Sequence, residues 1–237
     1  MTMQERAAGH ALVVGATSAI GQAIAQELAR LGYRLTLWGR DEARLAEAVG
    51  VCSGSAVAER VDVTDPPEAG AAVRRLAGRG PLTAAVWAPG VFDWAPADRA
   101  DPDVWGRLLD VNLVSAARCT PLLLPLLIDA APSALIFLGS GAAHQVYANN
   151  AAYVASKHGM AGLAGSTFLD VRDRDVKVSL ISPGLVAAGA GLLSPAGQQH
   201  PERLLQPEDV AAAVRFVVTF PARGCPTEIQ LQPQRQP

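Results

Sequence analysis

The chain has 237 residues, half of them apolar, and its 20 basic and 22 acidic side chains leave a formal net charge of −2. This is the composition of a packed globular protein, without the basic excess typical of nucleic-acid or membrane-surface partners. The length suits one continuous α/β domain spanning residues 1–237. Three cysteines are widely spaced and form no CxxC pair, which indicates reduced thiols and a cytoplasmic protein.

Two segments are candidates for a targeting sequence or a membrane span. The N-terminal MTMQERAAGH lacks the order of charged, apolar and cleavage regions that defines a signal peptide. The stretch 121–139 is about as long as a bilayer span, but Pro125, Asp129 and Pro132 interrupt it. We therefore expect a buried helix ending near Asp129, a turn at 131–133 and a buried strand at 134–138, with no membrane partner.

Short apolar runs alternate with helical runs along the whole chain. The expected strands are ALVV (11–14), RLTLW (34–38), SAVAERV (55–61), TAAVW (83–87), ALIFL (134–138), KVSLI (177–181) and EIQLQ (228–232). Most are near-continuous apolar runs, as in a parallel sheet covered on both faces. The sequence therefore predicts a single-domain, Rossmann-type, doubly wound parallel β-sheet of about seven strands with helices on both faces.

The first strand leads directly into the glycine turn Gly15-Ala-Thr-Ser-Ala-Ile-Gly21. A helix opens within this turn, so its backbone N–H groups and positive end can hold a phosphate. A plain strand–helix turn is the alternative. If the turn binds a dinucleotide, its expected contacts are Gly15, Thr17, Ser18, Ile20 and Gly21.

The second strand ends beside the expected position of the adenosine ribose, where an acid binds the 2′-hydroxyl of NAD or a base faces the 2′-phosphate of NADP. Here the order is Gly39-Arg40, and the guanidinium of Arg40 can pair with a phosphate. Asp41 follows, in a place suited to the first turn of the next helix. We therefore expect NADP(H) to be preferred over NAD(H).

Tyr153 and Lys157 stand four residues apart in the helical run AAYVASKHG, which places both on one face. A tyrosine with a pKa near ~10 is a slow acid/base at neutral pH, and a lysine cation nearby would lower that pKa. Ser140 directly follows the strand 134–138, at the edge of the sheet, where its hydroxyl can donate to a substrate carbonyl. These side chains form a candidate catalytic group.

Together these residues resemble the short-chain dehydrogenase/reductase family, from the glycine turn to the helix near 207–219. The resemblance implies that Ser140 orients the carbonyl, Tyr153 transfers the proton, Lys157 also holds the nicotinamide ribose, and Asn112 completes a water-linked proton relay. Asn112 can alternatively cap or bend its helix. The further cofactor contacts implied are Asp62 and Val63, Ala88 to Gly90, Pro183, Gly184 and Val186.

The sequence departs from the family pattern at several positions. Ala19 replaces the middle glycine of the turn, Val14 replaces a threonine before it, and Ala188 stands where a threonine often contacts the nicotinamide amide. The C-terminus lacks the usual Asp-Gly-Gly ending. These departures put nicotinamide anchoring and the placement of the last strand in question.

The Gly/Ala-rich stretch of about residues 185–206 is expected to form a substrate lid, and residues 233–237 a frayed tail. Apolar residues of the lid can instead simply pack it onto the body. The candidate substrate contacts are Phe92, Trp94, His144, Tyr147, Leu185 and Leu192. No histidine–carboxylate set with metal-ligand spacing is present in the sequence, so we expect no catalytic metal.

These features favour a carbonyl reductase or secondary alcohol dehydrogenase that acts on a small molecule. One alternative is a redox-neutral epimerase or dehydratase that retains its cofactor. A second is a cofactor-binding protein without catalysis, because fold alone does not imply activity. The resemblance further implies a homodimer or homotetramer.

Overall fold

The computed structural model describes residues 9–237; the expectation about a signal peptide falls mainly on residues 1–8, outside this range. The strands are β1 His10–Val14, β2 Arg34–Gly39, β3 Ala56–Arg60, β4 Leu82–Trp87, β5 Ser133–Leu138, β6 Val176–Pro183 and β7 Glu228–Leu231. The helices are α1 Ala19–Arg30, α2 Glu42–Gly50, α3 Pro66–Ala77, α4 Pro102–Leu109, α5 Ser115–Asp129, α6 Ala151–Val171, α7 Ala190–Leu193, α8 Pro195–Gln199 and α9 Pro207–Thr219.

The strands form one 7-stranded sheet in the order β3-β2-β1-β4-β5-β6-β7. Every neighbouring pair is parallel. All the expected strands are present within two residues of their predicted bounds, and β7 occupies the edge although the family's usual C-terminal motif is missing. The predicted doubly wound sheet is therefore confirmed.

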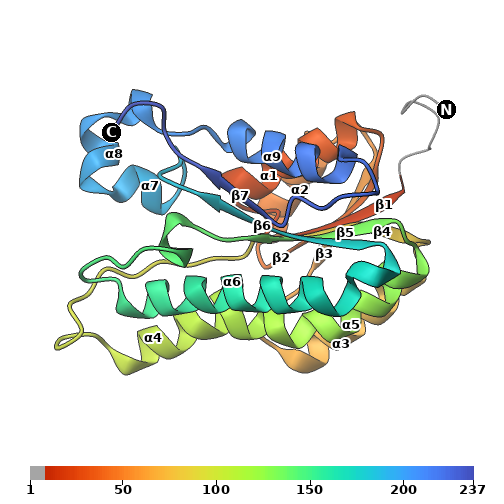
Figure 1. Cartoon of the computed structure of the whole chain (residues 1–237), viewed down its shortest axis with the longest axis horizontal. Coiled ribbons are helices and arrows are strands. Elements are labelled where there is room, and N and C mark those ends of the chain that lie inside the picture. Colours follow the sequence, from red (N-terminus) through yellow and green to blue (C-terminus); the bar gives the residue numbers. More distant parts are fainter. Residues whose placement is uncertain (1–8) are drawn as a thin grey trace.

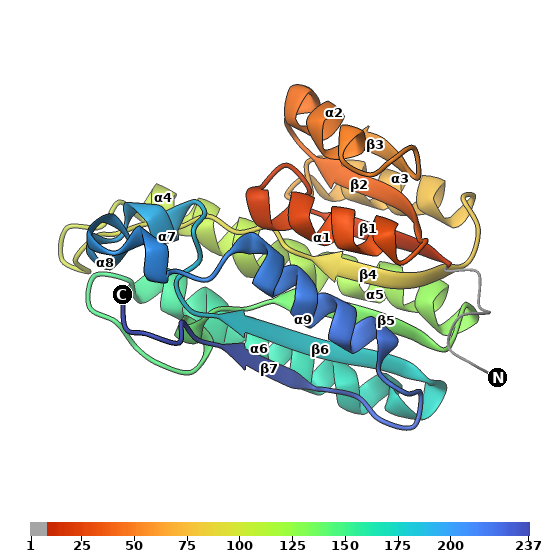
Figure 2. The same cartoon turned by 90° about the horizontal axis from the view of Figure 1, so that it is seen from above.

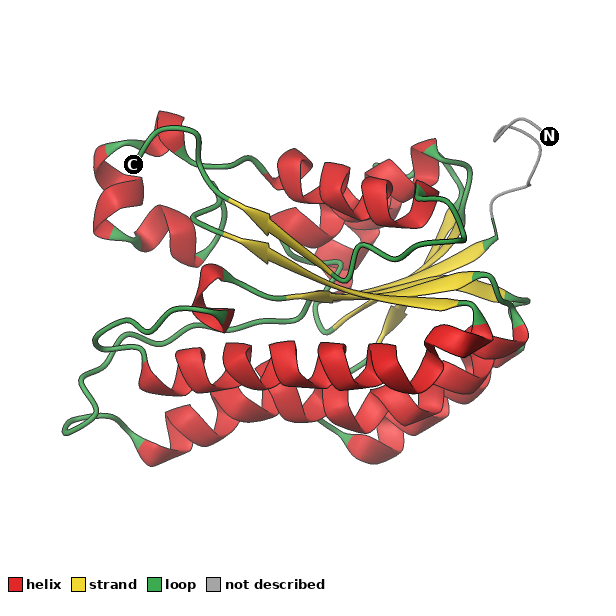
Figure 3. Cartoon of the chain, in the orientation of Figure 1, coloured by secondary structure: helices red, strands yellow, loops and turns green. Residues whose placement is uncertain are grey.

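The sheet lies between two helical layers (Figures 1 and 3). Alternate β1 side chains enter two separate cores: Leu12 and Val14 pack with α3, α5 and α6, whereas Ala11 and Val13 pack with α1 and α9. Viewed from above, α1 and α9 lie side by side across the middle of the sheet (Figure 2). Because both faces are covered, the five inner strands are almost wholly buried, whereas the edge strands β3 and β7 are partly exposed.

The chain order reverses between β1 and β4, which are neighbours in the sheet. In open α/β sheets, ligands bind outside the carboxyl ends of the strands at such a switch point. The turns after β1, β2, β3 and β4 all meet there. The fold therefore places the phosphate turn and the segment 88–90 next to each other.

The segment 102–129 forms one continuous helical stretch in which a π-helical turn, Asp110–Val114, joins α4 to α5. Pro121 and Pro125 lie inside α5 without breaking it. The prediction that Pro125 interrupts the apolar stretch is therefore wrong, because the helix continues on both sides of it. As expected, α5 ends at Asp129 and strand β5 follows. By length and composition this stretch can cross a membrane, but it packs against the sheet and α3, as core helices of water-exposed folds also do.

The expected lid, residues 185–206, contains α7, α8 and the short 3₁₀ turn Pro201–Arg203. Its two ends pair with each other, because the N–H of Ala187 donates to the carbonyl of Leu205 at 2.7 Å. The tail 233–237 runs beside it, where the Arg203 guanidinium donates to the carbonyl of Gln236 at 3.0 Å. Figure 1 shows the C-terminus at the same end of the molecule as α7 and α8.

Candidate active site

A cleft opens at the switch point of the sheet. The residues that line it are Val14, Gly15, Thr17, Ser18, Trp38, Gly39, Arg40, Val61, Asp62, Val63, Thr64, Ala88, Pro89, Gly90, Val91 and Val111. These include eight of the predicted cofactor contacts: Gly15, Thr17, Ser18, Arg40, Asp62, Val63, Ala88 and Gly90. These predicted contacts, which follow β1 to β4, make up half of the cleft lining.

The glycine turn has the backbone that a phosphate-binding loop requires. Gly15 has φ +80°, and a Cβ there would lie 2.9 Å from the backbone nitrogen of Pro89. Ser18 caps α1 by accepting the N–H of Gly21 at 3.0 Å, and Ala19 begins the helix without disturbing it. The N-terminus of α1 is thereby held at the cleft with its remaining N–H groups available to an anion.

At the far end of the cleft, Asp62 and Arg40 define a polar rim. Thr64 donates both its hydroxyl and its backbone N–H to the Asp62 carboxylate, at 2.7 and 3.0 Å. Burial alone would raise the pKa of Asp62, but these hydrogen bonds and the nearby Arg40 and Arg60 lower it overall. Asp62 is therefore a fixed carboxylate, while the exposed Arg40 offers a positive charge. Together the loop and rim fit a dinucleotide with phosphate groups.

Tyr153, in the first turn of α6, lies next to Ser140, which follows β5. Ser140 lies close enough to Tyr153 to affect the pKa of its phenol, and the Ser140 hydroxyl accepts the N–H of Ala142 at 3.2 Å. Burial raises the pKa of Tyr153; Ser140 opposes this, and Tyr147 adds to it. Tyr153 therefore holds its proton at neutral pH, as the donor in a carbonyl reduction must.

Lys157 lies one turn further along α6, almost fully buried. Its Nζ donates to the carbonyl of Leu138 at 3.0 Å and lies 5.7 Å from the centre of the Tyr153 ring. Burial lowers the pKa of Lys157 to about 8. Our expectation that Lys157 lowers the pKa of Tyr153 does not hold in this structure, because desolvation of the phenol outweighs a cation at that distance.

Asn112 occupies the π-helical turn and is fully buried. Its Nδ2 donates to the carbonyl of Val91 at 2.9 Å and to Ser156 Oγ at 3.2 Å, while its Oδ1 accepts the N–H of Val91 at 2.8 Å. The side chain therefore fixes the segment after β4. It also faces the same glycine as Lys157, since a Cβ on Gly90 would lie 3.9 Å from Asn112 Oδ1 and 3.8 Å from Lys157 Nζ.

Several predicted cofactor contacts lie outside the cleft lining. Ile20 and Val186 pack into the core beneath α1, and Gly21 allows α1 to approach the loop, since a Cβ there would lie 2.2 Å from the Gly15 carbonyl oxygen. Pro183 ends β6. A Cβ on Gly184 would meet the side chain of Gln232 at 2.6 Å. These residues shape the surroundings of the cleft in this structure.

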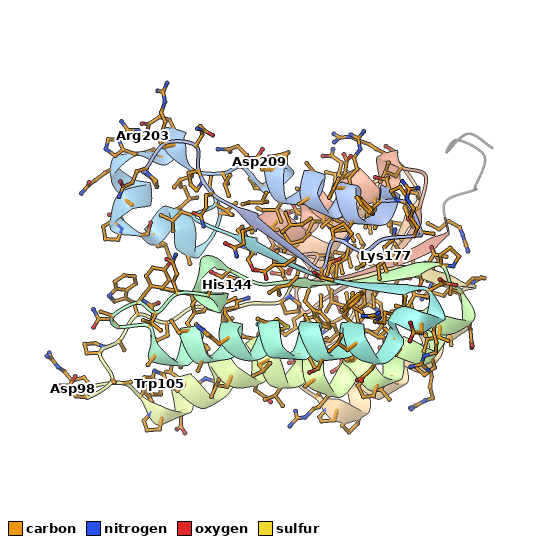
Figure 4. All side chains as sticks on the ribbon, viewed as in Figure 1. Asp98, Trp105, His144, Lys177, Arg203 and Asp209 are labelled. Atoms are coloured by element: carbon orange, nitrogen blue, oxygen red, sulfur yellow. The ribbon has the colours of Figure 1, made fainter. Side chains whose placement is uncertain are left out.

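The predicted substrate residues lie in three places. The Phe92 ring packs edge-on against the Tyr153 ring, with centroids 4.9 Å apart, and the Trp94 ring lies 6.0 Å from the Phe92 ring, while Tyr147 is near enough to Tyr153 to raise its pKa. His144 lies at the same end of the molecule as the lid residue Arg203, whereas Lys177 lies at the opposite end (Figure 4). The His144 ring is held by Glu228, at 2.6 Å. Leu185 and Leu192 belong to the lid.

Three residues around the cleft and the substrate loops were not predicted from the sequence. Thr64 fixes Asp62, and its place two residues after an aspartate is a signal for such a local turn. Glu228 and Gln232 reach this end of the molecule only because β7 adds to the sheet edge. No local sequence pattern predicts Glu228 and Gln232, because the residues next to them, His144 and Gly184, follow β5 and β6.

Comparison with known proteins agrees with this geometry. The profile of the short chain dehydrogenase family matches residues 9–195. The chain is 31% identical to cis-4-hydroxycyclohexanecarboxylate dehydrogenase of Sinomonas cyclohexanicum, over 88% of each chain. It is 28% identical to sulfoacetaldehyde reductase 2 of Chromohalobacter salexigens, over 95% of this chain and 94% of that protein. A metagenomic short-chain oxidoreductase solved with NADP superimposes with a TM-score of 0.84 at 26% identity, covering 98% and 99% of the two chains.

The chain therefore belongs to the short-chain dehydrogenase family. It is an oxidoreductase of the class that interconverts CH–OH and C=O groups with a nicotinamide cofactor.

Proposed function

We propose that the protein is an NADPH-dependent carbonyl reductase, or the corresponding secondary alcohol dehydrogenase. The observation that carries this proposal is the proximity of Ser140 to a half-buried, protonated Tyr153, next to Lys157 and the cleft. The two named relatives act on unlike compounds, an aldehyde sulfonate and a cyclohexane carboxylate. They support the reaction class but do not identify the substrate of this chain, which is inferred from its own site.

In the proposed reaction, Tyr153 Oη donates its proton to the carbonyl oxygen, which the Ser140 hydroxyl orients. A bound nicotinamide cofactor would supply the hydride. Thr17, Ser18 and the first N–H groups of α1 would hold its phosphates. Lys157 stabilises the phenolate that remains after proton transfer, because a cation near a phenolate favours the charged form. Asn112 fixes the backbone of Val91, a residue that follows β4 and lines the cleft.

Tyr153→Phe tests the reaction class. Removing the phenol leaves the ring and its packing but takes away the proton donor, so kcat is expected to fall by at least about 100-fold. NADPH binding, followed by the shift in Tm, should remain as in the unaltered protein. A redox-neutral relative would turn over without net change in cofactor absorbance, and a non-catalytic protein would show no turnover before or after the substitution.

The preference for NADPH is carried by Arg40. A cofactor at about 100 times its Kd stabilises by about 2.7 kcal/mol, which for a chain of this size corresponds to a shift of roughly 5 to 10 °C in Tm. We expect this shift with NADPH and a smaller one with NADH. Arg40→Leu should weaken NADPH binding about tenfold or more and leave NADH binding nearly unchanged. An equal loss for both cofactors would contradict a contact with the 2′-phosphate.

We further propose that the chain acts in the cytoplasm as one domain with a lid at 185–206, and that it assembles as a homodimer or homotetramer. The buried free thiols of Cys52 and Cys119 suit a reducing compartment.

A further inference from the structure

The chain is poor in aromatic residues, which make up 5% of it. Yet four of them gather at one end of the sheet: Phe92, Trp94, Tyr147 and Tyr153. The rings of Phe92 and Trp94 lie 6.0 Å apart, and Phe92 meets Tyr153 edge-on at 4.9 Å. Tyr147 is close enough to raise the pKa of Tyr153. The reactive phenol is thus lined by aromatic side chains.

These aromatic side chains remain open to solvent. Phe92 is 39% exposed, Trp94 56% and Tyr147 49%. Large apolar side chains clustered at the surface usually mark a binding site. Because they adjoin the proposed proton donor, the molecule they bind is the substrate rather than a partner protein.

The two loops that carry these rings are held in place. Asn112 binds both backbone groups of Val91, the residue before Phe92. The N–H of Ala95 donates to the carbonyl of Asn149 at 3.0 Å, which ties the loop of Trp94 to the loop of Tyr147. His144, on the second loop, is held by Glu228 of β7. A substrate would therefore meet an aromatic surface that is already formed.

The segment that carries Phe92 and Trp94 is acidic. The segment 92–103, FDWAPADRADPD, has four aspartates and one arginine. Arg99 lies 3.5 Å from Asp98 and so offers no free positive charge. A substrate carrying its own negative charge would be repelled here, whereas a neutral ring would not.

From this geometry we propose that the enzyme acts on neutral aryl ketones and the matching aryl carbinols, with the ring against Phe92 and Trp94 and the oxygen at Tyr153. The proposal rests on the function proposed above. Aromatic rings prefer edge-to-face contacts at centroid separations of 4.5–7 Å, and one such contact corresponds to roughly two- to tenfold in affinity. In the reduction, hydride from NADPH forms the new C–H bond, the proton of Tyr153 forms the new O–H bond, and NADPH is oxidised to NADP⁺.

The test compares acetophenone with cyclohexyl methyl ketone, which has a similar size but no aromatic ring, using the full chain and NADPH. We expect kcat/KM to be at least fivefold higher for acetophenone. Phe92→Leu and Trp94→Leu should each reduce this ratio by half or more, while the NADPH-induced shift in Tm stays the same. The matched control is Phe216→Leu, an exposed aromatic residue on α9, which should leave the ratio unchanged.

The outcomes separate this inference from the function on which it rests. Equal or better turnover of the cyclohexyl ketone overturns the aryl preference and leaves the reductase standing. A ratio that both substitutions leave unchanged overturns the role of Phe92 and Trp94. Reduction of 4-acetylbenzoate as efficient as that of acetophenone overturns the requirement for a neutral ring. Failure of every ketone and aldehyde, despite NADPH binding, overturns the proposed function itself.

Discussion

At the scale of single residues, Lys157 carries the largest electrostatic cost in the site. Burial lowers its pKa from 10.5 to about 8, so below pH 8 the folded protein holds a desolvated cation. This difference between the two pKa values lowers the free energy of unfolding by roughly 3 kcal/mol. The cost is fully present below about pH 8 and disappears as the pH rises toward 10.5, because only the unfolded chain then keeps the proton.

We therefore expect Lys157→Met to raise the free energy of unfolding by up to about 3 kcal/mol at pH 7 while abolishing turnover. Urea unfolding at several pH values measures this, and the gap between the two proteins should narrow between pH 8 and 10.5. Lys177→Met is the control. Lys177 is only half-buried and donates to two carbonyls at the end of α9, so its loss should stabilise the fold much less than the loss of Lys157. Equal stability of Lys157→Met and the unaltered protein would mean that the Leu138 carbonyl offsets the desolvation.

Local spacing was sufficient to find Tyr153 and Lys157, because both lie on one helix and the four-residue interval is visible in the sequence. It was not sufficient for the surroundings that set their pKa values. Burial and the nearby Tyr147 raise the pKa of Tyr153, and the Phe92 ring packs against it. Phe92 and Tyr147 come from two separate loops. The His144–Glu228 pair likewise joins residues that are far apart in the chain, so no local pattern predicts it.

At the scale of elements, the strands were predictable because most of them are short, almost uninterrupted apolar runs between helical runs. The π-helical turn around Asn112 was not, since no residue type marks it. Composition predicts a lid at about 185–206, but it did not predict the two short helices and the 3₁₀ turn that this segment forms. Their positions depend on contacts between glycines and backbone, which a sequence pattern does not reveal.

The lid offers a test at this scale. A Cβ on Gly191 would lie 1.9 Å from the carbonyl oxygen of Val186, so Gly191→Ala must shift α7. We expect kcat/KM to fall about tenfold or more with little change in Tm, because short surface helices contribute little to global stability. Gly50→Ala, where a Cβ meets nothing within 4 Å, should leave activity unchanged. A Gly191→Ala protein with full activity would show that the lid does not contact the substrate.

At the scale of the whole molecule, the two helical layers differ in their outer faces. The helical stretch 102–129 has a mean hydropathy of 1.6 over its most apolar 18 residues, of which 39% are buried. Helix α6, beside it in Figure 1, is apolar or small-residue-rich over most of its length. Leu122 is 43% exposed and Leu169 65% exposed on this layer. An apolar face of this kind is stable in water only if something covers it.

We expect a second copy of the chain to cover this face, giving a dimer or tetramer in sedimentation equilibrium. Introducing charge with Leu122→Glu and Leu169→Glu together should weaken assembly by at least about 100-fold, because an unpaired charge buried in an interface costs several kcal/mol. Phe216→Glu, on the opposite layer, should leave assembly intact. A monomer in the unaltered protein would contradict this expectation, and so would a protein that needs detergent to stay dispersed, because the apolar face would then be meeting lipid.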